Sequence, residues 1–317
     1  KVLGFDDTNL MRCLEWKSFT QILPFSCPIQ GGLLEGMSIT VCGRVLPEAC
    51  RFEVDLYHES DFVLHLNPRY DEGSGYVVHN TYQNTVWGKE ETKSQTPFPR
   101  GQLFALQILV TLIINGLSIK NNVDRVYVKG MVELNLVAFQ YLAVRKKYIH
   151  FRSLPILRYD IFLLIFMNIK KKKKKKKRYK IVIPLIHNQT VPYKSIIRGG
   201  VQPGKLFIIQ GVILDNRMEI FLRHKTGIAF YYSPRFEENV VVCNSYEDGM
   251  WGEQEQSELV LFKRGEPMQV TIYSSRLHYR VFVNGQQTQT YSHRYMKLEE
   301  IDVLEVSGDA QLSFVQA

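Results

Sequence analysis

Apolar residues alternate with polar ones along most of the chain, which is the pattern of half-buried β-strands. Residues 37–45, 52–57 and 62–66 carry an apolar side chain at nearly every second position, so one face of each segment turns inward. The same alternation recurs later, at residues 206–213, 219–222, 228–231, 240–243 and 268–273. Many short strands separated by turn residues predict an all-β fold of antiparallel, two-sheet β-sandwiches.

A polar motif occurs twice in the chain. The first copy is His65-Leu-Asn-Pro-Arg69, then Asn80, then Trp87-Gly-Lys-Glu90; the second is Tyr231-Tyr-Ser-Pro-Arg235, then Asn244, then Trp251-Gly-Glu-Gln254. Their nearly constant separation indicates an internal duplication. A chain of 317 residues has room for two cores of ordinary size. We therefore expect an N-terminal tail at 1–21, a first domain at 22–140, a linker at 141–189 and a second domain at 190–317.

The basic character of the chain comes from one segment of the expected linker. The formal net charge is +9, and the lysines and arginines between Lys170 and Lys180 account for all of this excess. The two repeats are together near neutral, so we expect no nucleic-acid partner for them. A nuclear-localisation interpretation of the lysines is also open.

The most apolar window, residues 161–169, is about half the length that a transmembrane helix needs, so we expect no transmembrane segment. With the adjacent lysines it could form an interfacial anchor, but a solvated linker is the favoured interpretation. The five cysteines form no metal-binding or disulfide pattern, and no signal peptide opens the sequence. We expect reduced thiols and synthesis in the cytosol.

One strand of the first repeat carries a row of polar groups. Strand alternation places His65, Asn67 and Arg69 on a single face. Imidazole, carboxamide and guanidinium together supply donors and acceptors for a hydroxyl-rich ligand without a metal. The indole of Trp87 would cover the apolar C–H patch of a sugar ring. Asn80 and Glu90 would add polar groups from neighbouring segments, and this combination predicts a saccharide site.

This constellation resembles the galectin family of β-galactoside-binding lectins, which have jelly-roll sandwiches, and the two copies resemble its tandem-repeat members. The resemblance implies carbohydrate-binding residues in both repeats: His65, Asn67, Arg69, Asn80, Trp87 and Glu90 in the first, and Arg235, Asn244 and Trp251 in the second. In the family pattern the polar row binds galactose hydroxyls, Asn80 contacts the 6-hydroxyl, Trp87 stacks on the ring, and Glu90 holds Arg69 and the neighbouring sugar. The resemblance also implies glycan partners, no cofactor, and export from the cytosol by a non-classical route.

Both repeats depart from the family pattern. In the second, Tyr231 and Ser233 replace the histidine and asparagine, and Gln254 and Gln256 replace the glutamate and arginine. These changes would leave Arg235 without its charged partner, so we expect the second domain to bind lactose weakly or not at all.

The first repeat has Thr92 where the family arginine belongs, which affects recognition of the second sugar. The first domain is also shorter than the second near residues 110–122, which predicts two shortened or missing strands. A mispredicted exon would give the same pattern.

The sequence leaves two other functions open besides a lectin. Glu90 with Glu91, or Asp71 with Glu72, could form a glycosidase carboxylate pair, but adjacent strand residues point to opposite faces, so we expect no enzyme. A galectin-scaffold interaction protein with reduced or lost sugar binding is the remaining alternative. The polar row alone could be a solvated strand face, and Trp251 alone would more often be a core residue.

Overall fold

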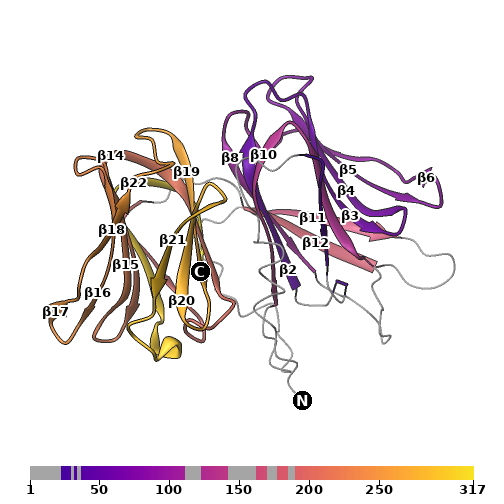
Figure 1. Ribbon diagram of the computed structural model, residues 1–317. Helices are drawn as coiled ribbons and strands as arrows, with labels where there is room; N and C mark the ends of the chain where they lie inside the picture. The colour runs from indigo at the N-terminus through magenta and orange to yellow at the C-terminus, as the bar shows by residue number, and fades with distance from the viewer. Residues whose placement is uncertain are drawn as a thin grey trace, which may run out of the picture. The chain divides into compact units, whose positions relative to one another are not determined.

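The computed structural model of the chain consists almost entirely of antiparallel β-strands (Figure 1). It describes residues 23–29, 32–33, 37–110, 123–141, 162–169, 177–184 and 190–317. These residues fall into two compact units that meet in sequence between residues 185 and 186. The all-β prediction is confirmed, and within the described ranges the only helical element is the 3-10 turn Leu298–Glu300.

The first unit contains two sheets. One has the order β1-β9-β3-β4-β5-β6, with β7 also paired to β5. Its strands are β1 (Phe25–Pro28), β3 (Phe52–His58), β4 (Asp61–Arg69), β5 (Tyr76–Gln83), β6 (Val86–Trp87), β7 (Glu91–Lys93) and β9 (Arg125–Gly130). The other sheet has the order β10-β2-β8-β12-β11. Its strands are β2 (Met37–Val45), β8 (Leu103–Leu109), β10 (Val132–Tyr141), β11 (Phe162–Ile169) and β12 (Lys177–Pro184).

The second unit repeats this arrangement as one continuous hydrogen-bonded network. Its two long strands, β14 (Leu206–His224) and β22 (Val303–Gln316), pair along most of their length and shift register between Ile213 and Met218, so each contributes to both layers. The remaining strands are β13 (Tyr193–Ile196), β15 (Gly227–Arg235), β16 (Val240–Glu247), β17 (Met250–Trp251), β18 (Glu255–Glu258), β19 (Pro267–Ser274), β20 (His278–Val283) and β21 (Gln286–Ser292).

Two strands from the expected linker take part in a sheet of the first unit. β12 pairs with β8, with Ile181 opposite Ile108, and β11 pairs with β12. In the second unit β20 pairs with β19, and β21 with β20. β12 and β11 therefore occupy the sheet positions that β20 and β21 occupy in the second unit. Residues 111–122 lie outside the described residues, so the expected shortening there and the expected domain boundaries stay predictions.

Each unit has an aromatic core between its layers. In the first, Phe52 is fully buried and stacks on Phe104 with ring centroids 5.2 Å apart. In the second, Phe230 stacks on Tyr279 at 4.7 Å. Burying one such ring contributes roughly 1.5–3 kcal/mol, so these clusters stabilise the sheets that carry the polar residues. Cys42 is also buried, and burial raises the pKa of its thiol.

Candidate functional site

The polar row of His65, Asn67 and Arg69 lies on β4, near the middle of its sheet between β3 and β5. His65 and Asn67 are buried, whereas Arg69 is partly exposed. Asn67 Nδ2 donates to the carbonyl of Phe52 at 2.8 Å, and Arg69 Nε donates to Asn67 Oδ1 at 2.6 Å. Asn67 therefore fixes the guanidinium, and the alternation predicted from the sequence is present in the structure.

Two further predicted residues flank the row. Asn80 on β5 pairs in register with His65, and its Oδ1 accepts a hydrogen bond from the Thr81 amide at 2.8 Å. Glu90 follows β6, and its Oε2 lies 3.8 Å from Arg69 Nη2. Both partners of this ion pair are substantially exposed, so solvent screens it and it orients Arg69 only weakly.

Trp87 presents its indole to solvent beside the polar row. The two-residue strand β6 pairs only with the end of β5, which leaves Trp87 49% exposed. Its ring centroid lies 5.1 Å from that of His65, and it also contacts Tyr82 and Phe62. The first unit thus holds an exposed aromatic platform next to a set of fixed hydrogen-bonding groups.

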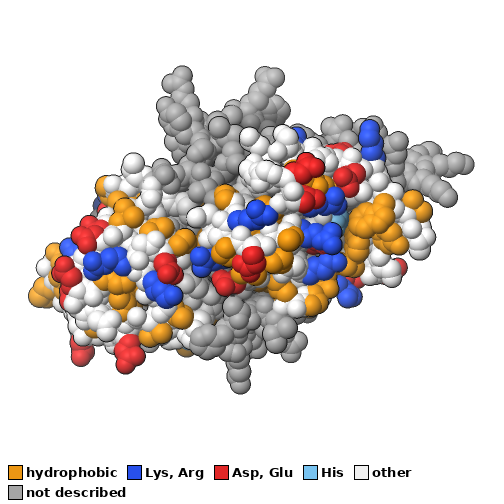
Figure 2. Space-filling model, turned by 90° about the horizontal axis from the view of Figure 1, so that it is seen from above, with side chains coloured by type: hydrophobic (Ala, Val, Ile, Leu, Met, Phe, Trp, Pro, Cys, Tyr) orange, Lys and Arg blue, Asp and Glu red, His pale blue; other side chains and the backbone are white. Residues whose placement is uncertain are grey.

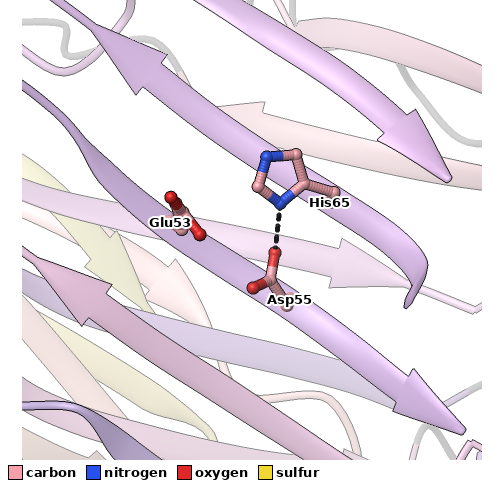
Figure 3. A group of neighbouring side chains, drawn as sticks. All are labelled: Glu53, Asp55 and His65. Carbon is pink, nitrogen blue, oxygen red and sulfur yellow. Dashed lines mark hydrogen bonds and ion pairs between the residues drawn. The ribbon is translucent and has the colours of Figure 1, made fainter. Parts of the chain in front are cut away.

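The imidazole of His65 is hydrogen-bonded to Asp55, an acidic residue that sequence reasoning missed. Asp55 Oδ1 lies 2.7 Å from His65 Nδ1, and Asp55 is fully buried (Figure 3). Burial raises the pKa of Asp55 above its ordinary value, and the neighbouring imidazole acts in the opposite direction. The sequence feature that could have identified Asp55 is its position on the polar face of the predicted strand 52–57.

Glu53 completes a group of three potential cation ligands with Asp55 and His65. Their ligand atoms all lie within 4.8 Å of one another. The ammonium of Lys129 already sits 2.9 Å from Glu53 and neutralises it, while His65 engages Asp55. The group is thus compensated by side chains of the chain itself.

A depression of about 350 Å³ lies next to the polar row. It is lined by Cys50, Arg51, Arg69 and Asp71. Figure 2 shows basic side chains (blue) and acidic side chains (red) close together on the face in view. Arg69 borders both this depression and the polar row, so its guanidinium is accessible from solvent.

In the second unit the corresponding polar positions are engaged with other side chains. Tyr231 donates to Glu219 Oε1 at 2.9 Å, and Arg235 Nη1 contacts both carboxylate oxygens of Glu238 at 3.0 Å. The expectation that Arg235 lacks a charged partner is therefore wrong. Glu238 lies three residues after Arg235, in the turn that follows β15, and supplies the carboxylate from a different place than Glu90 does in the first unit.

Trp251 is presented like Trp87. It is 51% exposed, and its ring centroid lies 5.2 Å from that of Tyr231, so the alternative of a core tryptophan is wrong. Asn244 pairs in register with Tyr231. Its Oδ1 accepts from Arg294 at 3.2 Å, and its Nδ2 donates to the Gly252 carbonyl at 3.0 Å.

Arg294, which the sequence did not single out, connects several parts of the second site. Besides Asn244 it binds Glu255 Oε1 at 2.8 Å. Its Nη1 also lies directly against Gly252, because a Cβ built there would come within 2.7 Å of that atom. Arg294 follows β21, so no local periodicity could have linked it to Trp251 and Asn244.

Both units match one family. A family model described as galactoside-binding lectin matches residues 24–126 and 192–317. The chain is 30% identical over 338 residues to galectin-4 of Rattus norvegicus, covering 94% of this chain and 96% of that protein. It is 26% identical over 317 residues to the 32 kDa beta-galactoside-binding lectin of Haemonchus contortus, covering 96% and 98%.

Solved structures give shorter matches. Sheep galectin-11 in complex with glycerol aligns with a TM-score of 0.38 and 23% identity, over 40% of this chain and 98% of that one. The galectin LEC-6 of Caenorhabditis elegans aligns with a TM-score of 0.39 and 22% identity, over 41% and 94%. In the part of the chain that the structure describes, no helix is long and apolar enough to cross a bilayer.

Proposed function

Because this chain belongs to the galactoside-binding lectin family, the galectins, and carries two copies of the family domain, we propose that it is a lectin for β-galactoside glycans in which the first unit is the stronger binder. The family binds sugars and does not transform them, which supports a role without catalysis. Binding would use side chains alone, without a metal.

A single arrangement carries the proposal. The half-exposed indole of Trp87 stands beside His65, on the sheet that also presents Arg69. A galactose ring has an apolar C–H patch that an indole can cover and hydroxyls that need both donors and acceptors. The first unit offers these two kinds of surface side by side, with Asn67 holding the guanidinium in place.

The contacts within the second unit support weaker galactoside binding there than in the first unit. Its tyrosine hydroxyl is directed to Glu219 and its arginine to Glu238. A sugar hydroxyl would have to compete with these internal partners, and each hydrogen bond lost relative to the first unit costs about 1 kcal/mol. Trp251 remains exposed, so the second unit keeps an aromatic platform for a ligand of different polarity.

Two sites on one chain would bridge glycans on different glycoconjugates, and the linkage raises avidity when both sites engage. The internal ion pairs of the second unit favour one alternative, a scaffold whose second unit has reduced or lost sugar binding and serves another interaction. Cytosolic synthesis followed by non-classical export stays a prediction; secretion assays on cells that express the full chain would test it.

Calorimetry on the full chain tests the proposal. We expect heat on titration with lactose, none with sucrose, and a stoichiometry near one if the first unit dominates. A stoichiometry of two with equal affinities would contradict weaker binding at the second unit. No heat with lactose or N-acetyllactosamine, from protein with an intact thermal unfolding transition, would favour the non-lectin alternative. Release of free galactose during the incubation would indicate an enzyme.

A further inference from the structure

We propose that Asp55 is a positioning residue that holds His65 with its proton on Nδ1, so that Nε2 is a fixed hydrogen-bond acceptor for a ligand hydroxyl. The inference deepens the proposed function and, in its binding arm, rests on it. It assigns Asp55 a role in specificity, because a fixed acceptor selects ligand groups that can donate.

The geometry of the pair is suited to this role. Asp55 on β3 and His65 on β4 are direct partners in the antiparallel register, and Oδ1 lies 2.7 Å from Nδ1. Figure 3 shows the second ring nitrogen on the side of the imidazole away from Asp55. A carboxylate at one nitrogen therefore leaves the other free to meet a ligand, and the hydrogen bond at the first nitrogen sets the tautomer.

The shared proton lies on the imidazole. Burial raises the pKa of Asp55, whereas the hydrogen bond and the charge of the imidazole lower it. A carboxylate oxygen accepts, so the 2.7 Å bond to Oδ1 places the proton on Nδ1. The other titratable groups near the pair are Glu53 and Tyr57 on β3, Lys129 and Tyr127 on β9, and His79 on β5. Glu53 and Lys129 neutralise each other at 2.9 Å. They leave the local charge balance of the Asp55–His65 pair intact.

A carboxylate at this buried position lowers the stability of the fold, which argues that Asp55 has a function. Asp55 is fully buried, and within the part of the chain that the structure describes its second oxygen, Oδ2, has no hydrogen-bond partner. A buried ionised group with an unsatisfied oxygen is destabilising compared with an apolar residue of similar size. Packing alone would therefore favour an apolar side chain here.

In the second unit the position that corresponds to Asp55 is apolar, and the histidine is also replaced. Phe221 pairs with Tyr231 in the same register in which Asp55 pairs with His65. Their ring centroids are 5.2 Å apart, and both belong to a buried apolar cluster with Ile228 and Val242. Within one chain, a carboxylate occupies the register position opposite the histidine and a phenyl ring occupies the position opposite the tyrosine, as expected if Asp55 serves the imidazole.

A fixed acceptor complements the other groups of the polar row. The Arg69 guanidinium can only donate, and both polar ends of the Asn67 amide are engaged within the protein. A ligand hydroxyl can accept from arginine and donate to Nε2 at once. A fluorine in its place can only accept a hydrogen bond. The pair should therefore make the first unit discriminate strongly between a hydroxyl and a fluorine at the position that contacts His65.

The test compares the full chain with Asp55→Ala, Asp55→Asn and the matched control Glu53→Gln, which neutralises a neighbouring carboxylate that makes no hydrogen bond to His65. Imidazole ¹⁵N shifts, assigned with His65→Gln among the eight histidines, report the tautomer without any sugar. We expect the Nδ1–H form in the wild type and in Glu53→Gln, and a large Nε2–H population in Asp55→Ala. Asp55→Asn keeps the side-chain shape and an oxygen that can accept from Nδ1–H, so it should retain more of the Nδ1–H form than Asp55→Ala does.

Binding of lactose and of a series of monofluorinated galactosides then tests the specificity. We expect Asp55→Ala to bind lactose about tenfold more weakly, the loss of one good hydrogen bond, and to lose much of the discrimination against the fluorinated sugar. An unchanged tautomer in Asp55→Ala would overturn the inference, as would an equal loss of lactose affinity in Glu53→Gln. Failure of the wild type to bind any galactoside would refute the proposed function and leave the tautomer measurement valid.

Discussion

Replacing Trp87 with alanine should weaken lactose binding far more than the same replacement of Trp251. Trp87 is 49% exposed. A tryptophan side chain offers about 150–250 Å², so the exposed half presents roughly 100 Å², of which one face is about 50 Å². Covering this face and a similar area of sugar C–H surface at ~25 cal/mol per Å² contributes roughly 2.5 kcal/mol. That corresponds to a ~70-fold loss of affinity.

Isothermal titration of the full chain measures this effect, and the chain provides its own matched control. Trp251 is 51% exposed and stands against Tyr231 much as Trp87 stands against His65, so its removal causes a similar local change. We expect lactose affinity within about twofold of wild type for Trp251→Ala, a change within ordinary error in binding free energy. Equal losses in both variants, or an affinity of Trp87→Ala within twofold of wild type, would refute the reasoning.

Three further outcomes follow from the structure. Burial lowers the pKa of His79 to about 4 from an ordinary 6.5, so the unfolded state binds the proton first and stability of the first unit should fall as pH drops from 6.5 to 4; in denaturant titrations the dependence of unfolding free energy on pH should be steeper for wild type than for His79→Leu in this window, and equal slopes would contradict it. Deleting residues 162–184 should expose the edge of β8 and speed hydrogen exchange of its amides at residues 107–109, with β19 as the internal reference; unchanged exchange would contradict the pairing. Arg294→Ala should lower the unfolding free energy of the second unit by about 1 kcal/mol and leave lactose affinity unchanged; a loss of lactose binding would place Arg294 in the dominant site instead.

The sequence was sufficient for features that depend on strand periodicity. A period of two places residues 65, 67 and 69 on one face whatever the surrounding fold, and the structure has them on one face of β4. The Asp55–His65 contact depends in addition on the register between β3 and β4, which the turn at Glu59 and Ser60 sets together with a bulge between Leu56 and Tyr57. The turn alone would place Asp55 opposite Leu64, so periodicity and turn length together could not have predicted this contact.

Other features depend on contacts that no local pattern encodes. Glu238 reaches Arg235 because the turn after β15 folds back on its own strand, and Arg294 meets Asn244 across 50 residues of sequence. The pairing of β12 with β8 joins segments on either side of β9 and β10. Alternation identified none of these three contacts, since it predicts which face a side chain occupies and not which turn or distant strand becomes its neighbour.

The two units share one fold but differ in the residue pair at one register position. Exchanging Asp55 and His65 for Phe221 and Tyr231 replaces a buried polar pair by an aromatic one in the same register, which removes the cost of an unsatisfied carboxylate oxygen. The tyrosine hydroxyl and the arginine then find internal carboxylates, so the second site is satisfied without a ligand. The first site keeps an exposed arginine and a fixed imidazole that only a ligand can satisfy fully. We therefore expect this chain to bridge two different partners more readily than two identical galactosides, because binding at the second unit must replace interactions that the protein already makes.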